Sequence, residues 1–170
     1  MALSKPAIRG ITDPAEFAGS VRVIRNSFKT VADEFGLTRE NAPTHPAFFT
    51  LGRLKLMVSR GAMSFGLFIG DKQIGFIAVE PAQDGVFYIE RLAVLPAYRH
   101  DGYGAKLTSF AIDYIRQHKG KKVALGMINE QTDLREWYKK LGFKEVRTQK
   151  FPQLPFTVCF MERDVRPLRD

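Results

Sequence analysis

Cysteine and histidine are both scarce in this chain of 170 residues, which holds one cysteine and three histidines. A lone Cys159 excludes an intramolecular disulfide and a zinc site built from cysteines. It lies in an apolar, β-prone run, and a buried thiol without a neighbouring base is inert, so we expect a packed side chain rather than a nucleophile. His45, His100 and His118 are far apart in the sequence and have no carboxylate cluster beside them, so no metal site is expected.

Long apolar runs are missing too. No stretch could span a bilayer without being interrupted by charge, and the first residues hold no apolar run of signal-peptide length, so we expect a cytoplasmic protein. Repeats, low-complexity segments and linkers are also lacking in the sequence. The length suits one folding unit with a substantial core, and we predict a single domain over residues 1–170.

The charge is strongly positive, with a formal net charge of +8 and a pI near 9.7. Such a balance permits binding to nucleic acid, a membrane surface or a phosphorylated cofactor. Between Arg99 and Lys150 there are twelve basic and six acidic residues, whereas residues 61–98 hold two basic and four acidic ones. Because the sequence contains no run of five like charges, a basic nucleic-acid tail is excluded.

Hydrophobic periodicity and turn residues predict the elements. An Asp13-Pro14 start and a Gly36 stop bound the first helix, and Gly70 lies in a hairpin turn. Helices are expected over residues 17–35 and 48–60 and around 107–115 and 134–141, and strands over 7–12, 64–69, 73–80, 86–95, 123–128, 144–150 and 157–162. The order is β-α-α-β-β-β-α-β-α-β-β. It predicts an α/β fold with a mixed, mostly antiparallel sheet, parallel neighbours from the later strand-helix-strand units, and helices on both faces.

The most informative stretch is residues 92–107, which read Leu-Ala-Val-Leu-Pro-Ala-Tyr-Arg-His-Asp-Gly-Tyr-Gly-Ala-Lys-Leu. A strand ends at a proline, and two glycines then open a helix, whose first N–H groups have no partner. With the helix dipole, this makes an anion site suited to a pyrophosphate, although a plain strand-to-helix turn remains open. A dinucleotide fingerprint needs a glycine where Leu107 stands, and no Gly-Lys-Ser or Gly-Lys-Thr loop occurs.

Two motifs in order give the chain a family resemblance. Arg99-x-x-Gly102-x-Gly104, following a strand end at Val94-x-Pro96, resembles the acetyl-CoA signature of the GNAT superfamily of N-acetyltransferases. Downstream, Tyr138-Lys-Lys-Leu-Gly-Phe resembles the second hallmark of that family. The resemblance covers about residues 85–143, and it implies a GNAT-like fold and acetyl-CoA as cosubstrate.

The resemblance also implies roles for residues along these motifs. The pantetheine arm would bond the end of a strand, the pyrophosphate would bind backbone N–H groups of the following loop, and an amide side chain would contact the pantetheine. The implied cofactor-binding residues are Leu92, Ala93, Val94, Arg99, His100, Asp101, Gly102, Tyr103, Gly104, Ala105, Asn129 and Gln131. Asp101 departs from the family pattern, which has a basic or neutral residue there, so its charge must point to solvent. For the amide contact, Asn129 and Gln131 remain alternatives.

Two residues are candidates for the chemistry. The resemblance implies that Tyr138 protonates the departing thiolate, whereas the alternative is a core residue beside Trp137. An ammonium has no lone pair, so a base should help the amine to react. Glu90 is the candidate, either as this base or as the partner of a nearby cation. Strand alternation would place it on the same face as Leu92.

The amine itself is not readable from the sequence. The resemblance places it against residues 37–49, which include Glu40, His45 and the pair Phe48-Phe49, and against the loop over residues 151–156. In its Thr-His-Pro context, His45 is either a turn residue or a ligand.

The predicted function is an N-acetyltransferase that moves an acetyl group from acetyl-CoA to a primary amine by direct attack in a ternary complex, without a metal. The acceptor is a small-molecule or peptide amine. Neither nucleic acid nor a membrane is expected as a partner, and the resemblance leaves a homodimer open. Two alternatives compete: a non-catalytic CoA-binding regulatory module, which the presence of Glu90 and Tyr138 argues against, and a basic nucleic-acid-binding protein, which rests on charge alone.

Overall fold

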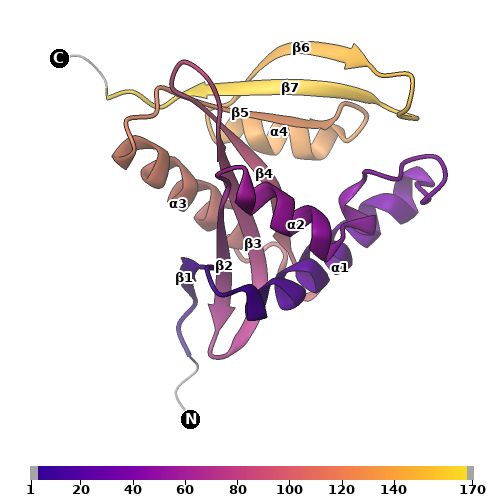
Figure 1. Ribbon diagram of the computed structural model, residues 1–170. Helices are drawn as coiled ribbons and strands as arrows, with labels where there is room; N and C mark the ends of the chain where they lie inside the picture. Colours follow the sequence, from indigo (N-terminus) through magenta and orange to yellow (C-terminus); the bar gives the residue numbers. More distant parts are fainter. Residues whose placement is uncertain (1–3, 168–170) are drawn as a thin grey trace.

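The computed structural model describes residues 4–167, and its strands and α-helices follow the predicted order (Figure 1). The strands are β1 (Ala7–Gly10), β2 (Met63–Ile69), β3 (Lys72–Pro81), β4 (Val86–Val94), β5 (Lys122–Ile128), β6 (Lys144–Lys150) and β7 (Thr157–Asp164). The helices are α1 (Phe17–Phe35), α2 (Leu51–Ser59), α3 (Tyr103–Gln117) and α4 (Thr132–Lys140), with short 3-10 turns at Pro14–Glu16, Pro46–Phe48 and Pro96–Tyr98. The predicted α/β fold class is confirmed.

The strands form a seven-stranded sheet in the order β1-β2-β3-β4-β5-β7-β6. Within this sheet β4 and β5 are parallel and the other neighbours are antiparallel. We expected parallel neighbours from both later strand-helix-strand units, and this is wrong for the second unit. There, β7 pairs between β5 and β6, and the β6–β7 hairpin forms the outer edge at the top of Figure 1.

Helices cover both faces of the sheet. On the α3–α4 face, Leu107 and Ile115 of α3 and Tyr138 of α4 belong to a buried cluster with side chains from β2 to β5 and β7. On the α1–α2 face, a second cluster joins α1 and α2 to β3 and β4. Cys159 is fully buried in the first cluster, and burial raises the pKa of its thiol, as expected for a packed side chain.

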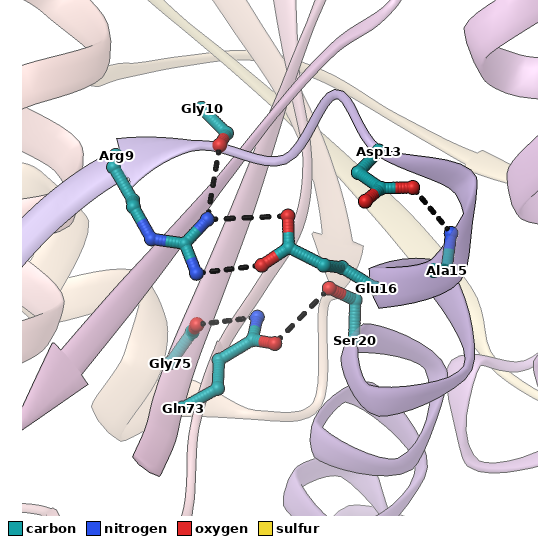
Figure 2. A network of polar contacts seen from close by, with 8 residues as sticks. All are labelled: Arg9, Gly10, Asp13, Ala15, Glu16, Ser20, Gln73 and Gly75. Atoms are coloured by element: carbon teal, nitrogen blue, oxygen red, sulfur yellow. Dashed lines mark hydrogen bonds and ion pairs between the residues drawn. The ribbon is translucent and has the colours of Figure 1, made fainter. Parts of the chain in front are cut away.

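The first helix begins as predicted at Asp13, whose carboxylate accepts a backbone N–H at 2.9 Å, although the first turn is a 3-10 turn. Figure 2 shows that Glu16 does not reach back to the cap but binds Arg9 of β1, at 2.6 and 3.2 Å. Beside this pair, Ser20 donates a hydrogen bond to Gln73 of β3 at 3.1 Å. These contacts hold α1 against the sheet.

The second helix is shorter than predicted. Thr50 caps it by accepting the Arg53 N–H at 3.3 Å, so α2 begins at Leu51. Of the residues expected at its start, Phe48 instead ends the 3-10 turn Pro46–Phe48, which His45 caps. No helix within residues 4–167 is long and apolar enough to cross a membrane.

A β-bulge in β4 changes which side chains share a face. Phe76 lies opposite Ala93 but Ala78 lies opposite Glu90, so β4 holds one extra residue there, and Arg91 adopts a left-handed φ of 56°. Glu90 therefore shares the α1–α2 face with Ala78, whereas Leu92 packs against the cluster on the α3–α4 face. Our expectation that alternation puts Glu90 and Leu92 on one face is wrong, because alternation fails across a bulge.

Candidate functional site

The site lies where two neighbouring strands part. β4 and β5 pair at residues 86–88 and 122–124, and no pairing between them continues past Tyr88 and Ala124. A cavity of about 880 Å³ opens beyond that point, lined by residues 89–94 of β4 and 125–128 of β5. We call it the large cavity. It exposes an unpaired strand edge, and the family resemblance implies that the pantetheine arm would bind along such an edge.

One side of the large cavity, the loop side, is formed by the segment that joins β4 to α3 and by the start of α3. His100 and Gly102 both have a left-handed φ, of 69° and 81°. Lys106 donates its N–H to the Gly102 carbonyl at 3.0 Å, and the preceding N–H groups of the first turn lack helical acceptors. The backbone thus presents donors at the positive end of the α3 dipole, an arrangement that suits a phosphate.

Gly104 serves a different purpose from Gly102. A Cβ on Gly104 would lie 3.3 Å from the Trp137 ring, so the missing side chain lets α4 approach α3. A Cβ on Gly102 would meet nothing within 4 Å, and its left-handed backbone alone is what favours glycine there.

The Arg99 side chain is engaged within the protein. Its guanidinium donates to the Val94 carbonyl at 3.2 Å, to the Thr30 hydroxyl at 2.8 Å and to the Ser27 carbonyl. It therefore links α1 to the end of β4. These contacts use three of the five N–H donors of the guanidinium, and Arg99 also lines the large cavity, so its part in binding the cofactor stays a prediction.

The remaining motif residues divide into those that line the large cavity and those that do not. Leu92, Ala93, Val94, His100, Tyr103, Ala105 and Gln131 line it. Asp101 is exposed and lies outside the lining, so its charge points to solvent. Asn129 is also outside, and both its carbonyl and its side-chain oxygen accept hydrogen bonds from Arg135, at 2.6 and 2.9 Å. Of the two amides, the structure brings Gln131 to the cavity.

Tyr138 reaches the large cavity from α4. Its ring packs edge-to-face on Trp137 and Phe143, with centroids 4.9 and 5.5 Å apart, and only 6% of the residue is exposed. Burial raises the pKa of its hydroxyl above the usual value, so the phenol keeps its proton at neutral pH. Core packing and a proton donor facing the cavity are therefore compatible in this residue.

Glu90 lines the same cavity from β4. Its carboxylate pairs with the Arg91 guanidinium, Oε2 to Nη1, at 3.2 Å. Burial raises the pKa of Glu90, Arg91 opposes that shift and Glu80 adds to it. Glu90 and Arg91 also line a second cavity of about 230 Å³ beside α2, the small cavity, so the pair stands between the two spaces.

A second part of the lining is formed by Phe28, Val31, His45, Pro46, Phe156 and Val158, which we call the α1 wall. His45 is 6% exposed, its Nδ1 accepts the Ala47 N–H at 3.2 Å, and its ring packs edge-to-face on Phe28 and Phe48. Burial and then Arg91 lower the pKa of His45 to about 4, so the ring is neutral at pH 7. His45 thus both caps a turn and lines the cavity.

Other residues of the two expected segments lie elsewhere. Glu40 is exposed and away from the large cavity, and Phe49 faces the small cavity. Sequence reasoning missed Arg91 and Phe28. Arg91 did carry a signal, since it is the one cation of β4 and directly follows Glu90 in a strand whose other residues are apolar or aromatic. Within residues 4–167, no group of three or more His, Cys, Asp or Glu side chains is arranged to hold a metal ion.

A family model described as "Acetyltransferase (GNAT) family" matches residues 28–143, which include the loop side, α4 and the part of the α1 wall that comes from α1 and the turn before α2. The chain belongs to the GNAT acetyltransferase family. The GNAT resemblance noted in the two sequence motifs is confirmed.

GNAT relatives are found both by sequence and by structure. A protein named "Probable N-acetyltransferase camello" from Xenopus tropicalis is 28% identical over 117 residues, which are 65% of this chain and 53% of that protein. The chain therefore spans about half the length of this relative. The ribosomal-protein-S18-alanine N-acetyltransferase of Escherichia coli superposes with a TM-score of 0.77 at 13% identity, covering 98% of this chain and 97% of that one. The PaiA N-acetyltransferase of Thermoplasma acidophilum, solved with coenzyme A, also gives 0.77, at 19% identity, covering 94% and 99%. The two structures share the GNAT fold with this chain.

Proposed function

We propose that this chain is an N-acetyltransferase that moves an acetyl group from acetyl-CoA to a primary amine by direct attack within a ternary complex. The observation that carries the proposal is the large cavity. It combines an unpaired strand edge, the donor-rich start of α3, a protonated tyrosine and a half-buried glutamate. Family membership supports the same activity.

The lining of the large cavity fits acetyl-CoA. The backbone of residues 92–94, which faces the gap left by β5, suits the amides of an extended pantetheine arm, in the manner of an added strand. The left-handed loop at His100 and Gly102 suits the pyrophosphate, and Gln131 offers an amide to the arm. Coenzyme A in the solved complex of a GNAT relative supports this assignment.

Two side chains would move protons in the reaction. Bound in the cavity, acetyl-CoA would supply a thioester carbonyl carbon for the amine to attack. Glu90 would take the proton from the ammonium, directly or through a water molecule, so that the nitrogen lone pair is free. A C–N bond then forms and the C–S bond breaks, and Tyr138 would donate its hydroxyl proton to the departing sulfur. The nitrogen would release its second proton to solvent as the amide forms, and the tyrosinate would regain a proton from solvent. The raised pKa of each group matches its role, because Glu90 holds a proton more readily than an ordinary glutamate and Tyr138 stays protonated.

Calorimetric titration with acetyl-CoA tests the proposal, with free CoA and a nicotinamide dinucleotide as comparisons. We expect saturable binding of acetyl-CoA and no binding of the dinucleotide, followed by thiol release when a panel of primary amines is added. The protein must first be stripped of any CoA that copurifies. Absence of acetyl-CoA binding would overturn the proposed function. Location in the cytoplasm and assembly as a homodimer stay predictions.

A further inference from the structure

We propose that the amine acceptor carries a carboxylate, which Arg91 binds and to which His45 donates a second hydrogen bond. The inference rests on the proposed function and names the substrate class of the same site. It is carried by an arginine in the β4 bulge that is largely enclosed yet incompletely hydrogen-bonded, and that lines the large cavity.

Arg91 reaches the cavity because of the bulge. Its left-handed φ of 56° turns its side chain to the α1–α2 face, the same face as Glu90. Its Nη1 pairs with Glu90, but its Nε is buried and has no hydrogen-bond partner within residues 4–167. Protein atoms cover this Nε, but a guanidinium has five N–H donors, and within residues 4–167 only Nη1 has a hydrogen-bond partner, so a ligand in the cavity that Arg91 lines can accept from the donors that are not covered. Glu90 alone does not satisfy this guanidinium.

The charges around Arg91 limit how much negative charge a ligand can add there. Arg53 and Arg91 both lie against the Phe49 ring, with their Cζ atoms 5.5 and 5.2 Å from its centroid. Burial lowers the pKa of Arg91, Arg53 lowers it further, and Glu90 and Glu80 act in the opposite direction. Two carboxylates therefore already face two guanidiniums. A singly charged carboxylate would therefore leave less unbalanced charge in the site than a doubly charged phosphate.

His45 supplies a donor on the same side. Because its Nδ1 accepts a backbone N–H, the neutral ring carries its proton on Nε2. A neutral N–H donor close to a guanidinium recognises an oxygen acceptor and offers nothing to a second ammonium group. The rest of the α1 wall is apolar, with Phe28, Val31 and Phe156, so a polyamine would find no counter-charge along it.

The test uses matched acceptors that differ only in the carboxylate, phenylalanine and phenethylamine, with acetyl-CoA saturating. The wild-type protein is expected to use phenylalanine with a kcat/KM at least about tenfold higher, since a hydrogen bond to a charged group contributes roughly that factor. Arg91→Met should lower kcat/KM about ten- to hundredfold more for phenylalanine than for phenethylamine, mainly through KM, because only phenylalanine loses a charged contact. Arg91→Lys keeps the charge and should retain part of the preference. If Arg91→Met does not fold, Arg91→Lys still tests whether the preference for phenylalanine depends on this side chain.

Arg60→Met is the matched control, because Arg60 lines the small cavity but not the large one. This variant should keep the preference for phenylalanine. A second readout avoids turnover: calorimetric binding of N-acetylphenylalanine and N-acetylphenethylamine to the CoA-saturated protein should show the same order, and Arg91→Met should abolish it.

Three results would overturn the inference. Equal use of the two amines by the wild type would show that the site does not recognise a carboxylate on the acceptor, while the acetyltransferase function would stand. An unchanged preference in Arg91→Met, with a pH–rate profile shifted equally for both amines, would mean that Arg91 only positions and tunes Glu90. Failure of the acetyl-CoA titration would overturn the function, and this inference with it.

Discussion

The two sides of the large cavity are built in different ways. The loop side comes mainly from one stretch of chain, residues 92–105, and it offers backbone groups whose direction is set by two left-handed residues. The α1 wall comes from α1, the turn before α2 and the β6–β7 region, and it offers side chains. Between the two sides stand Glu90 on β4 and Tyr138 on α4.

This difference shows which part of such a site can be predicted from a sequence. Backbone recognition depends on local conformation, so a short glycine-containing motif carries it. Side-chain recognition depends on which distant segments meet, and no local pattern holds that information.

Removing the Tyr138 hydroxyl should have the largest effect on turnover. Tyr138→Phe keeps the packing on Trp137 and Phe143, so kcat should fall by about 10²-fold or more while acetyl-CoA affinity is unchanged. Tyr114→Phe is the control, because this tyrosine stacks on His118 outside the large cavity. Steady-state kinetics and calorimetry measure both quantities. Unaltered turnover in Tyr138→Phe would leave Tyr138 as a packing residue of the loop side.

Glu90→Gln should lower kcat/KM by about 10²-fold and remove the acid limb of its pH profile. A base acts only when ionised, so the wild-type rate should rise with pH, and burial places that rise above the ordinary glutamate pKa of 4.5. Glu80→Gln sharpens the test. Because Glu80 raises the pKa of Glu90, its removal should shift the acid limb to lower pH. A near-normal profile in Glu90→Gln would exclude Glu90 as the base.

Arg99→Met tests whether the two sides of the cavity are held together by a structural link. Loss of the hydrogen bonds to Ser27, Thr30 and Val94 should reduce the free energy of unfolding by about 2–3 kcal/mol, measured with urea. Arg25→Met, on the exposed side of α1, should change it by less than about 0.5 kcal/mol. Unchanged stability with lost acetyl-CoA binding would instead make the Arg99 side chain a direct cofactor contact.

Gly102→Val should weaken acetyl-CoA binding roughly tenfold, since a branched side chain at a left-handed φ costs about 1–2 kcal/mol. Gly36→Val is the matched control. Gly36 has a φ of 62° at the end of α1 and equally open space around a Cβ, so it carries the same strain away from the cavity. The control should lose stability but keep affinity. Equal affinity in both variants would contradict a backbone-built loop side.

His45→Asn addresses the α1 wall and should have the smallest effect. In the wild type the pKa of His45 is about 4 when folded and near 6.5 when unfolded, so the unfolded chain binds the proton first. Stability should therefore fall as the pH drops from 6.5 towards 4. Asparagine also caps a helical turn but does not titrate, so this variant should lose less stability over that range. Urea unfolding at pH 7 and pH 5 compares the two proteins, and identical losses would mean that His45 is not buried as a neutral ring.

Most of the fold was predictable because its boundaries are marked locally. Gly36, Gly70 and Gly142 take left-handed conformations where helices and strands end, and glycine is the residue that announces such positions. Arg91 takes the same conformation without being glycine. The sequence therefore did not predict the bulge, which puts Glu90 and Leu92 on opposite faces of the sheet. For His45, the local Thr-His-Pro sequence did predict the turn, whereas its burial comes from Phe28, seventeen positions earlier. The hydrogen bond from Arg99 to Thr30 of α1 was not predictable either, because it joins segments that are far apart in the sequence.

The parting of β4 and β5 also bears on solubility. An unpaired strand edge at the rim of a sheet invites a second chain to add to it, and proteins guard such edges with charge. Here the outermost strand β6 is fully exposed and carries Lys144, Glu145, Arg147 and Lys150. The edge left unpaired by β5 lines the large cavity together with residues of α1 and α4, so it lies in the middle of the sheet and not at its rim. The fold can thus keep an unpaired strand edge away from the rim, where the pairing of a second chain is most favoured.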